Sequence, residues 1–175
     1  MGSVLGRGIG NQCTLLLTAD GGGHRLKDNT AHVGCAVAGF VVSHGVYRCL
    51  DLVVMPMPAG EMPEEAETNG LYSALLLRKY FLGRAWEDGW DPQEPDRIAG
   101  DSKNTVDGMV GLSRVKHPQL QRWSAGVLAA LQDFRRDVDI FAIPRSVNGM
   151  ADYGAGQAVK LAASLSSVMN RWLAV

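Results

Sequence analysis

The sequence has 175 residues, which is enough for one hydrophobic core of ordinary domain size. Apolar residues make up 46% and charged residues 20%, a composition that excludes a disordered chain. The formal net charge of −1 excludes a strongly basic protein, so nucleic-acid binding would have to depend on a local basic surface and on bound metal ions.

Three strands are expected near the start of the chain. An apolar run over residues 15–19 predicts a buried strand that ends in a tight turn at Asp20 and the three glycines after it. Residues 32–43 and 46–57 are rich in Val and small apolar residues, and the Ser-His-Gly between them predicts a hairpin. We therefore expect three antiparallel strands in succession.

The rest of the chain alternates between helices and short strands. Pro63 suits the first turn of a helix, and apolar residues recur at helical spacing over residues 66–82. Further along we expect a loop at 83–95, a strand at 97–100, helices at 102–110 and 118–136, a strand at 138–143 and a helix at 150–174. The order βββαβααβα predicts an α/β protein of the α+β type, with a five-stranded mixed sheet and helices on its faces.

Three cysteines, Cys13, Cys35 and Cys49, lie in apolar surroundings without the spacing of metal ligands or a disulfide framework. Buried, reduced thiols are the expected state, which favours a reducing intracellular compartment, the cytoplasm or the nucleus. The sequence has no apolar run long enough to span a bilayer, so no membrane partner is expected.

Two acidic residues lie where separate elements are predicted to meet. Asp20 ends an apolar run, where an unpaired carboxylate is costly to desolvate and a divalent cation would offset that cost. Glu67 lies near the start of the long predicted helix, beside its apolar face. Taken singly, Asp20 is also explained as a turn residue, and Glu67 as a solvated first-turn acid like Glu64 and Glu65.

Asp101 and Asp152 occupy similar positions. Asp101 follows a short predicted strand and precedes a helix, which also suits an N-cap. Asp152 lies in the first turn of the last helix, where it would also stabilise the helix dipole. The common feature of all four acids is that each lies at a strand end or a helix start.

Four segments together resemble the ribonuclease H family. They are the Thr-Ala-Asp-Gly-Gly of residues 18–22, the Ala-Glu of 66–75, the Gly-Asp-Ser of 100–107 and the Asn-Gly-Met-Ala-Asp that ends 143–152. The resemblance covers residues 14–160 approximately, in the family's order of motifs and elements. It implies a ribonuclease H-like fold in a single domain that spans residues 1–175.

Two features depart from the family pattern. The bacterial type has a histidine shortly before the last aspartate, whereas this chain has none between Phe134 and Asp152 and carries Arg145 there. This resembles the reverse-transcriptase-associated and archaeal-like branch that lacks the histidine. The family often has an asparagine three residues before the helix glutamate, and here that residue is Glu64.

The resemblance implies an endonuclease that hydrolyses the RNA strand of RNA/DNA hybrids with two Mg²⁺ ions, for which Mn²⁺ would substitute. It assigns metal binding and catalysis to Asp20, Glu67, Asp101 and Asp152, which would repel one another without metal and therefore have raised pKa values. The hybrid is the expected partner, and a covalently linked reverse transcriptase domain is a further one. Substrate contacts are expected from Gly21, Gly22, Ser102, Lys103 and Arg145, and phosphate contacts also from Arg78, Lys79 and Arg84.

Three alternatives remain open. The chain is also compatible with an inactive ribonuclease H-like module that binds nucleic acid or protein, or with a related exonuclease or transposase core that uses the same metals. A strand followed by Asp-Gly-Gly also begins sugar kinases and actin-like ATPases. That architecture needs two such domains and a second phosphate loop, for which this sequence has no second Asp-Gly loop of that kind.

Overall fold

The sheet has five strands in the order β3-β2-β1-β4-β5. The computed structural model describes residues 11–27, 30–57, 63–114, 118–133 and 136–173. The strands are β1 (Asn11–Arg25), β2 (Ala31–Ser43), β3 (Val46–Pro56), β4 (Trp90–Gly100) and β5 (Val138–Ala142). Pairing is antiparallel between β1, β2 and β3, whereas β4 runs parallel to β1 and β5 runs parallel to β4. The predicted antiparallel succession and mixed sheet are confirmed.

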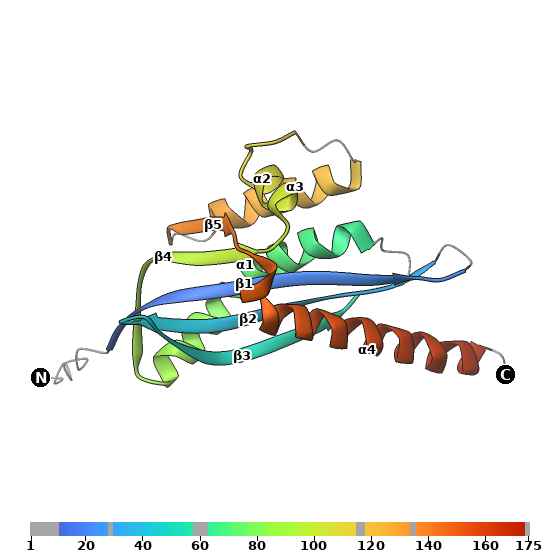
Figure 1. The fold of residues 1–175 in the computed structure, drawn as a ribbon, viewed down its shortest axis with the longest axis horizontal. Helices are drawn as coiled ribbons and strands as arrows, with labels where there is room; N and C mark the ends of the chain where they lie inside the picture. The colour runs from blue at the N-terminus through green and yellow to red at the C-terminus, as the bar shows by residue number, and fades with distance from the viewer. Residues whose placement is uncertain (1–10, 28–29, 58–62, 115–117, 134–135, 174–175) are drawn as a thin grey trace, which may run out of the picture.

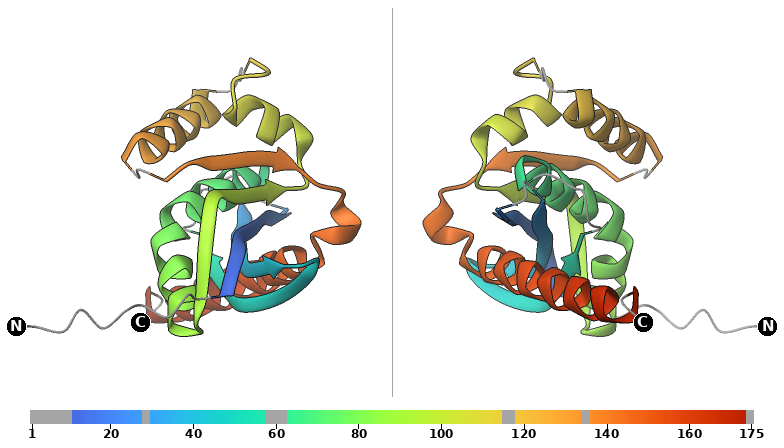
Figure 2. Two further views of the ribbon diagram at one scale, coloured as in Figure 1. Left: turned by 90° about the vertical axis from the view of Figure 1, so that its left-hand side faces the viewer. Right: turned by 90° about the vertical axis from the view of Figure 1, so that its right-hand side faces the viewer.

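Helices cover both faces of this sheet (Figures 1 and 2). They are α1 (Pro63–Glu87), α2 (Lys103–Met109), α3 (Pro118–Asp133) and α4 (Gly149–Leu173), with a short 3-10 helix η1 (Arg145–Val147) before the last. One face packs on α1, which also contacts α3, and α4 covers the opposite face along β2, β1 and β3. The predicted fold class is therefore confirmed. No helix in the described ranges is long and apolar enough to cross a membrane.

The core lies between β1 and α1. Alternate residues of β1, Leu15 and Leu17, are fully buried because a strand directs every second side chain to the same face. Helix α1 meets them with Leu71, Ala74 and Leu75, whose spacing of three and four residues places them on one helical face. This packing fixes the start of α1 against the end of β1.

The predicted loop at residues 83–95 is wrong. Helix α1 continues through Gly83 to Glu87, and β4 already begins at Trp90. Proline is unusual inside a central strand, because it has no N–H for a sheet ladder. The strand accommodates Pro95 because the pairing of β4 with β1 is irregular there, between the partners of Thr14 and Leu16.

The predicted tight turn after Asp20 is also wrong, because β1 continues through the glycines to Arg25. A close approach explains why Gly21 has no side chain. A Cβ at Gly21 would lie 2.0 Å from the backbone carbonyl carbon of Ala66 and 2.4 Å from the backbone nitrogen of Glu67. The start of α1 therefore lies directly on the β1 backbone.

Arg78, expected to be an exposed phosphate ligand, is buried with 1% of its surface exposed. Its Nε lies 3.3 Å from Oδ2 of the fully buried Asp96. Arg136 donates to the same carboxylate, at 2.9 Å from Nη2 to Oδ1. Burial of a charged side chain requires such partners, so Arg78 is part of the interior and is not available to a nucleic acid.

Two further burial predictions need correction. Glu65 is 3% exposed and is therefore not a solvated first-turn acid. Cys13 and Cys35 are buried as expected, whereas Cys49 is exposed on β3. All three cysteines are free thiols.

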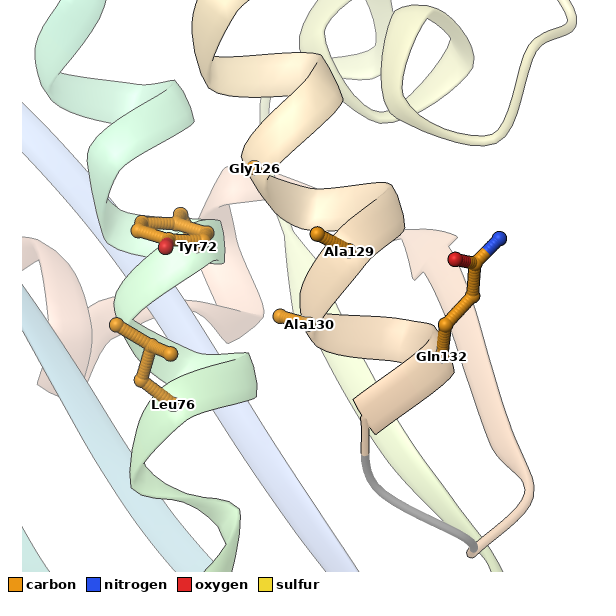
Figure 3. Close-up of a pocket in the computed structure, with 6 residues that line it drawn as sticks. All are labelled: Tyr72, Leu76, Gly126, Ala129, Ala130 and Gln132. Carbon is orange, nitrogen blue, oxygen red and sulfur yellow. The ribbon is translucent and has the colours of Figure 1, made fainter.

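A groove of about 430 Å³ separates α1 from α3 (Figure 3). Its lining residues are Tyr72, Leu76, Gly126, Ala129, Ala130 and Gln132. None of the four predicted acids lines this groove, so the acids do not belong to it.

The two neighbouring glycines of β1 allow a matched test of the close approach. Gly21→Ala should lower the free energy of unfolding by about 2 kcal/mol or more, because the new methyl group collides with the α1 backbone. A Cβ at Gly22 would meet only the side chain of Val159, at 3.8 Å, which is ordinary contact. Gly22→Ala should therefore change it by less than about 1 kcal/mol. Equal urea unfolding curves for both variants would contradict this account.

Candidate functional site

Parallel pairing brings Asp20 and Asp101 to the same edge of the sheet. Ala19 of β1 is in register with Gly100 of β4, and each acid is the next residue of its strand or strand end. Both are largely buried, with 6% of Asp20 and 8% of the Asp101 side chain exposed. Two carboxylates thus lie close together in a place of poor solvation.

Glu67 reaches this edge through the contact between α1 and β1. Besides Gly21, Gly70 permits that contact, because a Cβ there would lie 2.8 Å from the carbonyl oxygen of Asp20. The Glu67 side chain is partly buried and accepts a hydrogen bond from Thr105, with 3.1 Å between Oγ1 and Oε2. Glu67 is thereby joined to α2, the helix that follows Asp101.

Asp152 lies in the first turn of α4. This helix follows β5 and the short helix η1 in the chain. Asn148 fixes this turn, because its buried Nδ2 donates to the carbonyl oxygen of Ala19 at 3.1 Å. The backbone carbonyl oxygen of Asn148 accepts a hydrogen bond from the backbone N–H of Asp152 at 3.0 Å. Asn148 therefore links the strand that carries Asp20 with the helix that carries Asp152. Sequence reasoning did not single it out, although an asparagine just before a helix start is a recognisable signal.

The electrostatics agree with a cluster of like charges. The pKa of Asp20 is raised from 3.8 to about 7, first by burial and then by the charge of Asp101, with a smaller contribution from Asp152. A hydrogen bond from the Gly21 backbone and the charge of Arg145 act in the opposite direction. Near neutral pH the Asp20 carboxyl is therefore divided between its protonated and its charged form.

Arg145 supplies positive charge to this group. Its Nη2 lies 2.6 Å from Oδ1 of Asp152, and its Nε lies 3.9 Å from Oδ2 of Asp101. The guanidinium remains 77% exposed, so it is accessible to a phosphate group from solution.

No group of three or more His, Cys, Asp or Glu side chains within the described ranges is arranged to hold a metal ion. The chemistry of the residues present nevertheless fits a hard divalent cation, because the cluster consists of carboxylates. A second sign of this fit is the guanidinium of Arg145, a cation that already bridges Asp101 and Asp152. We therefore treat the cluster as compatible with Mg²⁺ or Mn²⁺.

The remaining predicted contact residues form two groups, one beside the cluster and one farther along α1. Ser102, and not Asp101, is the N-cap of α2. Lys103 is exposed and pairs with Asp107 one turn along that helix. Gly21 and Gly22 follow Asp20 within β1 and are partly exposed. Lys79 and the partly buried Arg84 lie on α1 about three and about five turns beyond Glu67, away from the cluster, and Arg84 pairs with Glu87.

Comparison with known proteins gives structural matches. No protein-family model and no curated protein matches the chain. The N-terminal RNase H domain of Rv2228c from Mycobacterium tuberculosis is 25% identical, with a TM-score of 0.66 over 88% of this chain and 99% of that one. LC11-RNase H1 in complex with an RNA/DNA hybrid is 18% identical, with a TM-score of 0.66 over 86% of this chain and 99% of that one.

A third match is the foamy viral protease-reverse transcriptase in complex with an RNA/DNA hybrid. It is 14% identical, with a TM-score of 0.63 over 84% of this chain and 20% of that one. Matches at such low identity show a common fold. Together with the mycobacterial domain, they show that this chain has a ribonuclease H-like fold and is related to the ribonuclease H family.

Proposed function

We propose that the protein is an endonuclease that hydrolyses the RNA strand of RNA/DNA hybrids with two Mg²⁺ ions, or Mn²⁺ in their place. Asp20, Glu67, Asp101 and Asp152 are the proposed ligands. The observation that carries the proposal is the convergence of acids from separate elements on a buried edge, where Asp20 has a pKa of about 7. Such a cluster opposes folding unless a cation is bound, so its presence favours a role in binding metal.

The proposed residues have three different roles: binding the metal ions, binding a phosphate and orienting the substrate strand. Bound metal ions would stabilise the charge on the attacking and leaving oxygens of the phosphodiester. The four carboxylates would hold those ions, and the exposed guanidinium of Arg145 would bind a phosphate oxygen of the substrate. Ser102, Lys103 and the backbone of Gly21 and Gly22 are proposed to orient the strand.

The proposed substrate is supported by the matched structures that contain RNA/DNA hybrids. A ribonuclease would distinguish RNA from DNA by contacts to the 2′-hydroxyl groups of one strand. The match to a protease-reverse transcriptase supports the further proposal that this chain works beside a covalently linked reverse transcriptase domain.

The first test is cleavage of a labelled RNA/DNA hybrid in Mg²⁺ and in Mn²⁺. We expect cleavage of the RNA strand, no cleavage of double-stranded DNA, and loss of activity in EDTA. Asp101→Asn should lower kcat by about 100-fold or more, because a proposed metal ligand loses its charge.

Asp139→Asn is a matched control, since Asp139 is an exposed acid on β5 away from the cluster. It should cleave like the unmodified protein. Hybrid binding without cleavage in either metal would favour an inactive binding module, and cleavage of DNA alone would favour a related nuclease.

The raised pKa of Asp20 predicts a pH dependence of stability in EDTA. The folded carboxyl binds a proton up to about pH 7, whereas a carboxyl with the ordinary value of 3.8 in the unfolded chain releases it earlier. The Asp20 contribution to the free energy of unfolding therefore falls as the pH rises between these values. Asp20→Asn should gain stability relative to the unmodified protein as the pH rises through that window, because the amide carries no charge to bury.

Urea unfolding of both proteins at several pH values measures this difference. Saturating Mg²⁺ at pH 8 should stabilise the unmodified protein and should have less effect on Asp20→Asn. A stability difference that is constant with pH would contradict the assigned pKa.

A further inference from the structure

Two hydroxyl groups lie between the N-terminus of α2 and the carboxylate of Glu67. Thr105 Oγ1 is 3.1 Å from Glu67 Oε2 and 2.8 Å from Ser102 Oγ. The backbone N–H of Thr105 in turn donates to Ser102 Oγ, at 3.4 Å, as part of the helix cap. These contacts connect the N-cap and first turn of α2 with Glu67 of α1, which is 38 residues from Thr105.

Proton counting fixes the direction of this chain of hydrogen bonds. An ionised carboxylate only accepts, so Thr105 must donate its single hydroxyl proton to Glu67. The 2.8 Å contact between the two hydroxyls therefore requires Ser102 to donate to Thr105. The order is thus Thr105 N–H to Ser102 Oγ, Ser102 O–H to Thr105 Oγ1, and Thr105 O–H to Glu67 Oε2. Such ordered chains strengthen each member bond.

The chain of hydrogen bonds restricts the orientation of the Glu67 carboxylate. With Oε2 held by Thr105, the described residues place no hydrogen bond on Oε1. Because Ser102 immediately follows Asp101, the same contacts couple the position of the Glu67 carboxylate to the end of β4. A partly buried site of this kind also excludes much of the water that would compete for the carboxylate.

We propose that Thr105 is a positioning residue that holds Glu67 by one oxygen, Oε2, and thereby presents Oε1 to a divalent cation. This inference rests on the proposed function, since it assigns Glu67 to metal binding. Thr105 touches neither substrate nor metal in this account. Its effect passes entirely through the orientation of Glu67.

The test measures Mg²⁺ and Mn²⁺ binding by calorimetry, without substrate, for Thr105→Val and Thr105→Ser. Valine keeps the shape of threonine and removes the hydroxyl, so the affinity for the metal should fall by about 10-fold or more. Serine retains the hydroxyl and should restore an affinity within about threefold of the unmodified protein. Unfolding curves of both variants show whether the fold is intact.

A double variant tests the route of the effect. In a Glu67→Gln background the negative charge held by Thr105 is absent, so adding Thr105→Val should change metal affinity by less than about twofold. In hybrid cleavage, Thr105→Val should shift the Mg²⁺ concentration required for half-maximal rate and leave KM for the hybrid unchanged. Additive effects of the two substitutions would overturn the proposal.

The outcomes separate this inference from the proposed function. If the unmodified protein binds metal and Thr105→Val binds it equally well, Thr105 has no positioning role and the proposed function stands. If Thr105→Ser loses affinity as Thr105→Val does, the hydroxyl is not responsible and the inference is wrong. If the unmodified protein binds no metal and cleaves no hybrid, the proposed function fails and the inference fails with it.

Discussion

The close approach of α1 to β1 is the constraint on which the candidate site depends. Gly21 and Gly70 remove side chains from both sides of this crossing, so that backbone lies against backbone. The buried core of Leu15, Leu17, Leu71 and Leu75 then fixes the helix in this position. A larger residue at the crossing would move the start of α1, and with it Glu67, away from the end of the sheet where Asp20 and Asp101 lie. The packing of the core therefore determines where Glu67 lies relative to Asp20 and Asp101.

The second constraint is electrostatic, and it acts against the fold. Burial and the neighbouring acids raise the pKa of Asp20, which means that its charged form is unfavourable in the folded protein. Arg145 lowers this repulsion by binding Asp152 and approaching Asp101, yet its guanidinium remains exposed. An exposed, solvated cation at the rim compensates less than a metal ion between the carboxylates would. This imbalance is the physical reason to regard the cluster as a binding site, because a group with a purely structural role is normally paired in full.

The sequence predicts the parts of this architecture that depend on local patterns. The three antiparallel strands follow from short apolar runs, and the helix after Asp101 was also expected, although its N-cap is Ser102 and not Asp101. The start of β4 was not predicted because its pairing with β1 shifts register around Pro95, and this shift depends on a partner strand far away in the sequence. The burial of Arg78 was missed because its partner Asp96 is 18 residues away, on a different element. The local periodicity of a sequence does not predict contacts between residues on different elements.

The same limit applies inside the candidate site. The four acids could be selected from the sequence because each was predicted to lie at a strand end or a helix start, which is a local property, although β1 continues past Asp20 to Arg25. The groups that orient them come from distant parts of the chain: Thr105 is 38 residues from Glu67, and Asn148 is 129 residues from Ala19. Both orienting contacts use neutral side chains, which add no further charge to an already repulsive cluster. In the proposed function, the acids would thus be oriented by hydroxyl and amide groups that belong to rigid elements.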